Sequence, residues 1–117
     1  MKKYFLSYIS STLLLLSNSL VHPLDFKGSE KEKENVIQYI SEHVKEQYTK
    51  IGMGSESMLR MMEKNELSSF KYLTSVKDRK LLDSVISKYC SIGMCSYNTI
   101  KMMYNNELKA SKEKLSW

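Results

Sequence analysis

Proline and glycine are scarce in this chain, which has one proline and four glycines among its 117 residues. Both residue types interrupt helices, so their scarcity favours an all-helical fold. The single proline, Pro23, precedes the segments with periodic apolar residues. Two of the glycines, Gly52 and Gly93, stand at matching places in an internal repeat, which predicts corners between helices there.

Groups that commonly carry catalysis are also sparse. Histidine occurs only as His22 and His43, and no glycine-rich phosphate loop is present. The acidic residues Glu42 and Glu46 flank His43, which predicts a position on the solvent side of its helix. Catalytic triads and carboxylate pairs require groups that converge in one pocket, and no spacing here indicates convergence. We therefore expect no enzymatic activity and no cofactor.

Long hydrophobic runs are absent except near the start. Two lysines precede an apolar run from Phe5 to Leu16, which small polar residues follow. This order is typical of a secretory signal peptide, and the run is too short for a comfortable membrane span. We predict a signal peptide over residues 1–19, cleavage within residues 19–22, and a periplasmic or secreted product. An uncleaved N-terminal anchor is the alternative.

A strong excess of one charge sign is absent as well. Removing Lys2 and Lys3 with the signal lowers the formal net charge from +5 to +3, with both signs interspersed. This balance is not typical of a nucleic-acid-binding surface. The stretch IGMGSESMLRMME resembles the turn and second helix of helix-turn-helix proteins that bind DNA. That pattern usually has a small residue four before the glycine, where both copies here have tyrosine. We expect no nucleic-acid partner, and no membrane partner after cleavage.

The most informative feature present is a repeat with an offset of 41 residues. Residues 47–67 read QYTKIGMGSESMLRMMEKNEL, and residues 88–108 read KYCSIGMCSYNTIKMMYNNEL. Ten of the 21 aligned positions are identical. A repeat this close indicates an architecture of two similar units.

Each copy predicts the end of one helix, a tight corner and the start of the next helix. The glycine suits the left-handed residue that ends a helix. The tyrosine lies in the last helical turn, where this stop motif makes a hydrophobic contact, and the methionine follows the glycine. The serine is a candidate N-cap for the next helix. These structural corner residues are Tyr48, Gly52, Met53 and Ser55, and their counterparts Tyr89, Gly93, Met94 and Ser96.

Periodic apolar residues predict four helices. The first follows a capping box at residues 29–32 and runs to about residue 51. The second spans about residues 55–73, the third follows a weaker capping signal at Ser75, and the fourth runs from Ser96 to about residue 112. The expected inward residues, helix by helix, are Ile37, Ile40, Val44, Tyr48 and Ile51; Leu59, Met62, Phe70 and Leu73; Leu82, Val85, Ile86 and Tyr89; and Ile100, Met103 and Leu108.

Cysteine occurs only as Cys90 and Cys95 in the second copy, where the first copy has Thr49 and Gly54. In an oxidising compartment two thiols this close are expected to pair. A bridge across so short a loop would contribute roughly 2 kcal/mol in the chain-entropy relation. The C-x4-C spacing differs from the C-x-x-C of thiol oxidoreductases. We predict a structural disulfide, with free or intermolecular thiols and a metal or redox role as alternatives.

Methionine is abundant, with seven copies after the signal peptide. Methionine fills cores and forms adaptable surfaces, while thioethers with thiolates also bind Cu(I). The neighbours in the pairs 61–62 and 102–103 point in different directions, which is poor for a shared ligand set, so we expect no metal. Glu66 and Glu107, each followed by leucine, are predicted to connect the two helix pairs. An exposed recognition edge is the alternative.

The predicted fold is a small all-α, four-helix domain of two tandem helix-corner-helix repeats after a signal peptide. Residues 20–28 form an extended leader and residues 29–117 the helical domain, with repeats over residues 29–73 and 75–115. The expected function is non-catalytic binding of another protein in the bacterial envelope, as an accessory, inhibitor or immunity-type factor. The alternatives are a Cu(I)-binding or oxidant-buffering Met/Cys protein and a periplasmic chaperone-like factor. The sequence names no partner and sets no oligomeric state.

Overall fold

The computed structural model describes residues 19–117, so the predicted signal peptide lies outside the described residues except for Ser19. Within residues 19–117 the chain forms four α-helices and one short 3-10 helix, and no strand. The predicted all-α class with four helices is therefore confirmed. The elements are η1 (Pro23–Asp25), α2 (Glu30–Lys50), α3 (Glu56–Leu73), α4 (Arg79–Ser91) and α5 (Tyr97–Lys112).

Three helices start directly after a serine. Ahead of α2, the Ser29 hydroxyl accepts a bond from the Glu32 N–H at 3.1 Å, and the Glu32 carboxylate accepts one from the Ser29 N–H at 3.1 Å. This is the complete capping box that the sequence predicted. Ser55 and Ser96 precede α3 and α5, and each accepts the N–H of the residue three positions on. These bonds satisfy donors that the first helical turn leaves unpaired.

The start of α4 differs from the prediction, because Asp78 rather than Ser75 caps it. The Asp78 carboxylate accepts a bond from the Leu81 N–H at 3.0 Å, and the Asp78 N–H donates to the Tyr104 hydroxyl at 3.2 Å. Ser75 instead belongs to the turn after α3, where its hydroxyl donates to the Tyr72 carbonyl at 2.9 Å. Because the Ser75 hydroxyl is bonded to the end of α3, the Asp78 carboxylate caps α4 instead.

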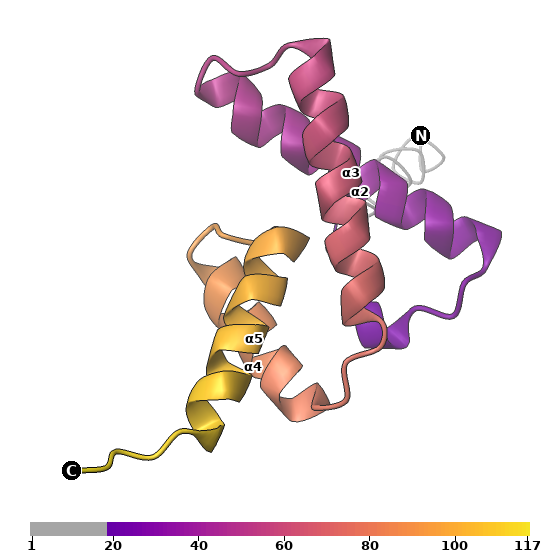
Figure 1. Cartoon of the computed structure of the whole chain (residues 1–117). Helices are drawn as coiled ribbons and strands as arrows, with labels where there is room; N and C mark the ends of the chain where they lie inside the picture. The colour runs from indigo at the N-terminus through magenta and orange to yellow at the C-terminus, as the bar shows by residue number, and fades with distance from the viewer. Residues whose placement is uncertain (1–18) are drawn as a thin grey trace, which may run out of the picture.

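Helix α3 occupies the middle of the packing order. Helices α2 and α5 both pack against α3, and α4 packs against α5. Figure 1 shows α2 crossing α3, with the α4–α5 pair beside the C-terminal half of α3. The two corners, residues 51–55 and 92–96, lie on the same side of the molecule, at the left of that view. Each helix thus buries one face against a neighbour, as amphipathic helices in a small domain must.

The core combines residues from all four helices. The prediction of inward residues is wrong for Ile37 and Ile51, which are 54% and 64% exposed. The apolar stripe of α2 is wider than the strip that α3 covers, and Ile51 lies past the last residue of α2. Val36 and Tyr39 are buried instead. The buried apolar residues are Val36, Tyr39, Ile40, Val44, Leu59, Phe70, Leu73, Leu82, Val85, Tyr97, Ile100 and Tyr104.

A row of aromatic rings joins the leader to α3, α5 and α2. The Phe70 ring centroid lies 5.1 Å from that of Phe26 and 4.9 Å from that of Tyr97. The Tyr97 ring in turn lies 5.6 Å from Tyr39. The Tyr97 hydroxyl donates to the Val21 carbonyl at 2.8 Å and accepts from the Val21 N–H at 3.1 Å. The leader, predicted to be extended, therefore includes one 3-10 turn and is fastened to α5.

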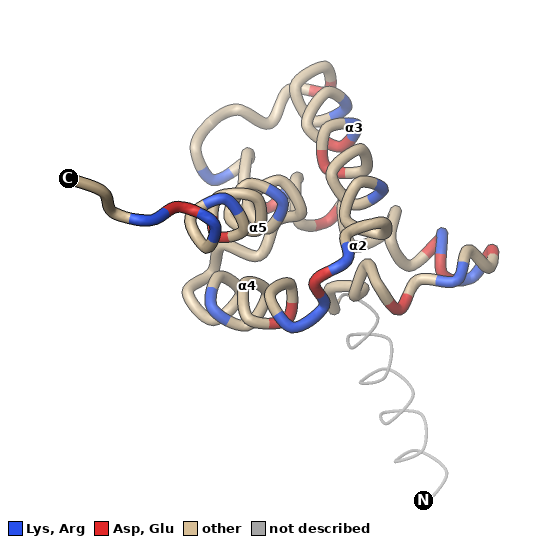
Figure 2. Tube along the Cα trace, turned by 60° about the horizontal axis from the view of Figure 1, so that its bottom comes forward, with Lys and Arg blue, Asp and Glu red and all other residues tan. Residues whose placement is uncertain are grey.

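Charged residues of both signs alternate along the helices (Figure 2). The ion pairs are mostly exposed; Arg60, for example, lies 3.4 Å from Glu56 and 2.8 Å from Glu63. Exposed pairs contribute little to stability, so apolar packing between helices is the main stabilising term. Among residues 19–117, no helix has the length and apolar character needed to cross a membrane.

Candidate binding cleft between the two corners

The two corners have the same backbone hydrogen bonds. In each, the methionine N–H donates to the tyrosine carbonyl five residues earlier, at 2.8 Å in the first corner and 2.9 Å in the second. Gly52 and Gly93 lie between these partners with φ values of +73° and +79°. This is the Schellman helix end, in which a left-handed residue turns the chain while the last carbonyls stay bonded. The bonded pairs are Met53 with Tyr48 and Met94 with Tyr89.

The corner side chains divide into packed and exposed ones. Tyr48 and Tyr89 pack against the core from the last turns of α2 and α4. The isoleucine and methionine on either side of each glycine are exposed, so both corners present an apolar tip to solvent. The exposed fractions are 64% for Ile51, 42% for Met53, 62% for Ile92 and 46% for Met94.

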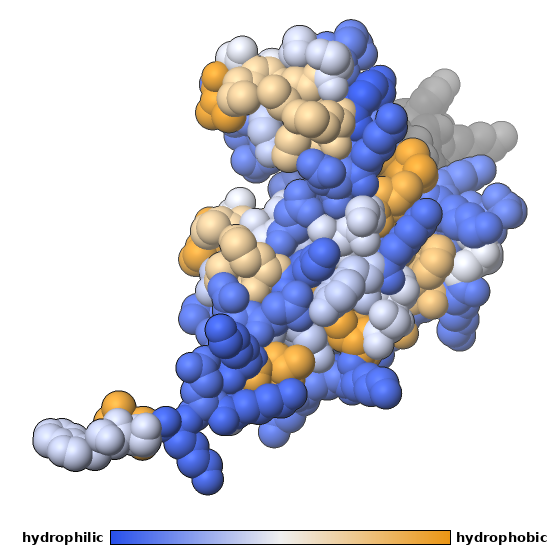
Figure 3. Space-filling view, in the orientation of Figure 1, coloured by the Kyte–Doolittle hydropathy of each residue, from blue (hydrophilic) through white to orange (hydrophobic). Residues whose placement is uncertain are grey.

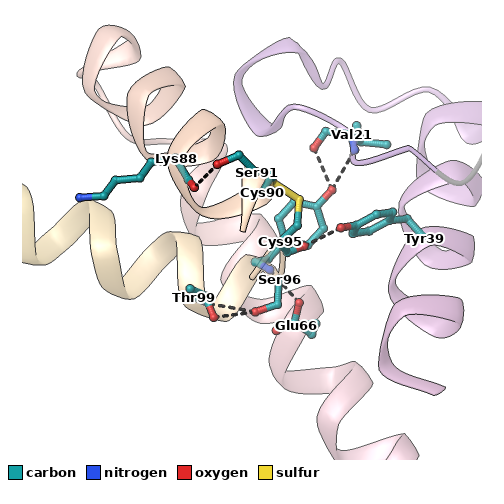
Figure 4. Close-up of a disulfide and its surroundings, with 10 residues drawn as sticks. Val21, Tyr39, Glu66, Lys88, Cys90, Ser91, Cys95, Ser96 and Thr99 are labelled. Atoms are coloured by element: carbon teal, nitrogen blue, oxygen red, sulfur yellow. Dashed lines mark hydrogen bonds between the residues drawn. A yellow bond between two sulfur atoms is a disulfide. The ribbon is translucent and has the colours of Figure 1, made fainter. Parts of the chain in front are cut away.

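A disulfide joins Cys90 to Cys95 across the second corner, with the two Cα atoms 4.2 Å apart (Figure 4). The predicted pairing is therefore present in the structure. The matching residues of the first corner, Thr49 and Gly54, also approach closely: a Cβ built on Gly54 would lie 3.0 Å from the Thr49 hydroxyl oxygen. The corner brings these two positions together in both copies, and cysteines occupy them in the second.

A cleft of about 380 Å³ lies between the two corners. Figure 3 shows it as the notch between two groups of hydrophobic residues at the left. The cleft brings together Tyr48, Gly93, Met94 and Ser96 of the predicted corner residues, whereas the other four corner residues lie outside its lining. Its main apolar lining is Val44, Tyr48, Ile51, Met62 and Met94, and its main polar lining is His43, Gln47, Glu66, Asn98 and Thr99.

Glu66 connects α3 to the start of α5 beside this cleft. Its side chain is buried, and its two oxygens accept bonds from the N–H groups of Tyr97 at 2.7 Å and Asn98 at 3.0 Å. A carboxylate at this place also suits the positive end of the helix dipole. Burial raises the pKa of the Glu66 carboxyl, although the two N–H bonds act in the opposite direction. The predicted connecting role thus holds for Glu66.

His43 does not face solvent as the sequence suggested. Its ring stacks on that of Tyr39, with centroids 5.4 Å apart and planes 13° from parallel, and it lines the cleft. Burial lowers the pKa of the imidazole, while the nearby Glu46 carboxylate raises it less. The ring is therefore neutral at pH 7, with one nitrogen able to accept a bond or bind a metal.

Tyr39 is a site residue that sequence reasoning missed. Its hydroxyl donates to the Cys95 carbonyl at 2.5 Å, which ties the second corner to α2 (Figure 4). Burial raises the pKa of Tyr39 to about 12, so the hydroxyl remains a donor at neutral pH. Its spacing of three residues from Val36, on the same helix face, was a signal for burial. No sequence signal pointed to a partner 56 residues away.

Within the part of the chain that the structure describes, no three His, Cys, Asp or Glu side chains are grouped as a metal ion would require. No protein-family model, curated protein or solved structure matches the chain. The geometry of the cleft and of the corners is therefore the basis for the functional proposal.

Proposed function

We propose that the chain is a small exported protein, built from two tandem helix-corner-helix repeats, that binds another protein without catalysis. Its place would be the bacterial envelope or the surrounding medium, and its role that of an accessory, inhibitor or immunity-type factor. One observation carries the proposal: two exposed apolar tips, Ile51 with Met53 and Ile92 with Met94, flank a single cleft.

The chemistry of the tips supports a protein partner. Exposed apolar side chains that gather on one side of a molecule commonly mark contact sites. Both isoleucines are more than 60% exposed, and hydrophobic residues of both corners face the same side in Figure 3. Methionine adapts its shape to a partner, which suits the second tip residue of each corner. The polar groups between the tips, such as Gln47 and Asn98, would orient the bound surface.

A photoreactive amino acid placed at Met53 or at Met94 tests the proposal. We expect both positions to cross-link to the same protein in cells that naturally produce the chain, because a partner that covers the cleft touches both tips. The exposed Lys80 on α4 is the matched control position and should give no such product. Different products from the two corners, or none, would contradict the proposal.

The partner identified in this way allows a quantitative test. Replacing Ile51 and Ile92 together by serine should weaken its binding at least about tenfold, which corresponds to about 1.4 kcal/mol. Both side chains are exposed, so the thermal melt of the variant should stay close to that of the unchanged chain. Undiminished binding by the folded variant would remove the tips from the interface.

One feature of the cleft favours soft-metal binding as a second candidate. Met62, Met94 and His43 line it together, and two thioethers with a neutral imidazole are ligands that Cu(I) accepts. Cys90 and Cys95 would contribute only after reduction of their disulfide. Stoichiometric Cu(I) binding that is lost when both methionines become leucine would support this candidate. The chaperone-like alternative instead requires that the chain suppress aggregation of unrelated proteins.

A further inference from the structure

A second hollow lies at the end of the α2–α3 pair that is farther from their shared corner. Its volume is about 370 Å³, within the range of small-molecule sites. Val36 and Phe70, each only 2% exposed, contribute the core side of this hollow. Phe26 of the leader lines it as well, and Phe26 also packs its ring against Phe70. The hollow is therefore a pocket with an apolar floor that three separate segments build.

A smaller hollow of about 170 Å³ continues the first one along the same helix pair. Both are lined by Ile37 and Leu67, so one apolar seam runs through them. Ile37, which the sequence predicted to be buried, is 54% exposed here. The larger hollow is lined by the N-terminal half of α2 and the C-terminal half of α3, two segments that diverge from their crossing in Figure 1. Figure 3 shows hydrophobic residues among hydrophilic ones on that side.

The charges around the larger hollow are positive. Lys33 from α2 and Lys71 from α3 line it, and no acidic residue does. Lys71 takes part in no ion pair within residues 19–117. Lys33 lies 3.4 Å from Glu30 in an exposed pair, which water and salt weaken. The seam thus combines an apolar floor with two cations from different helices.

The carboxylate at the smaller hollow is already engaged. Glu63 lines that hollow, and its oxygens lie 2.8 Å from the Arg60 Nε and 2.9 Å from an Arg60 terminal nitrogen. Lys64 lines the same hollow. An anionic ligand along the seam would therefore meet lysines, while the one acid is neutralised by its arginine.

We propose that this seam binds a single acyl chain that carries an anionic head group. The acyl chain lies between Ile37 and Leu67 over the floor, and the head group lies between Lys33 and Lys71. Burial removes the methylene groups from water, and the lysines neutralise the head group. A free fatty acid and a monoacyl phosphate share this chemistry. The volume of about 370 Å³ is that of a small-molecule site, which favours a single acyl chain over a protein helix.

Calorimetric titration of laurate into the full chain, below the micelle concentration of laurate, tests the proposal. We expect saturation at one laurate per chain. The double variant Lys33→Glu with Lys71→Glu should weaken binding at least about tenfold. The matched control, Lys45→Glu with Lys80→Glu, changes the net charge equally at exposed positions outside the hollow and should change the Kd less than about twofold. Ile37→Gln, at an exposed position, should weaken binding without unfolding the chain.

Several outcomes would overturn the proposal. They are the absence of saturable laurate binding, equal weakening by both double variants, and saturation by an amphipathic peptide but not by laurate. Saturation by laurate and not by lauroyl lysophosphatidate would assign the ligand to free fatty acids. Saturation by both would assign it to monoacyl anions in general. Replacing Ile51 and Ile92 by serine should leave laurate binding unchanged, so this proposal and that for the corners fail independently.

Discussion

Glu66 and Glu107 hold matching positions in the repeat, yet their surroundings differ. Glu66 is 4% exposed and accepts the first two N–H groups of α5. Glu107 is an exposed residue on α5, and within residues 19–117 its carboxylate accepts no N–H group from the start of a helix. The same residue type is thus a connector between helices in one copy and a surface charge in the other, because only Glu66 is bonded to the start of another helix.

Replacing Glu66 by glutamine tests this difference. The glutamine amide group would face a backbone N–H donor, so we expect the free energy of unfolding to fall by about 1–3 kcal/mol. Glu107→Gln is the matched control at the repeated position and should change it by less than about 0.5 kcal/mol. Urea unfolding followed by circular dichroism measures both. Equal effects of the two substitutions would show that the Glu66 bonds to α5 contribute nothing particular.

At the scale of elements, the corners depend on glycine for a conformational reason. A Cβ built on Gly52 or Gly93 would meet no atom within 4 Å, so space is not what requires glycine there. Both residues have φ near +75°, a region that other residues rarely adopt. Gly54 is the opposite case, since its φ is not positive and a Cβ would meet the Thr49 hydroxyl.

Replacing Gly52 or Gly93 by alanine should therefore destabilise the chain through the backbone alone. We expect a loss of about 1–2 kcal/mol for each, the usual cost of a left-handed conformation with a Cβ. Ser87→Ala on the exposed face of α4 is the control and should stay within about 0.5 kcal/mol. Thermal melts under non-reducing conditions give the comparison. A neutral effect at either glycine would mean that the corner has another conformation in solution.

At the scale of the whole molecule, the two copies differ at the positions just beyond the repeated stretch. Phe70 and Leu73 of α3 are buried in the core. The residues 41 positions later are Ser111 and Lys114, and both are exposed. The second copy therefore has exposed polar residues at the positions where the first copy contributes to the core.

The predicted signal cleavage and the disulfide together define the expected mature form of the chain. Val21 is bonded to Tyr97 and Pro23 is buried, so cleavage that preserves the packing leaves both in place. We expect the chain to be exported, to start near Leu20 after cleavage, and to be two hydrogens lighter than its reduced form, because Cys90 and Cys95 are expected to pair in an oxidising compartment. Mass spectrometry before and after reduction and alkylation measures both. Free thiols in the exported chain would contradict the disulfide and the compartment together.

The sequence by itself determined the features that depend on bonds between near neighbours. The helix starts after Ser29, Ser55 and Ser96 could be predicted because each cap spans three residues. The corners could be predicted because a glycine in the left-handed region and a carbonyl five residues before the following methionine suffice to form them. The start of α4 was missed because Ser75 and Asp78 are both good caps, and the end of α3 decided between them.

Only the tertiary structure decided which apolar residues are buried and which polar groups meet. Ile37 and Val36 are adjacent, and the line along which α3 crosses α2 selects Val36 for the core. Glu66 reaches α5 across 31 residues of sequence. The cleft forms only where α2, α3 and the start of α5 meet, and the apolar seam forms only where α2 packs on α3. Crossing angles arise from many side chains packing at once, so no local pattern in the sequence encodes these contacts.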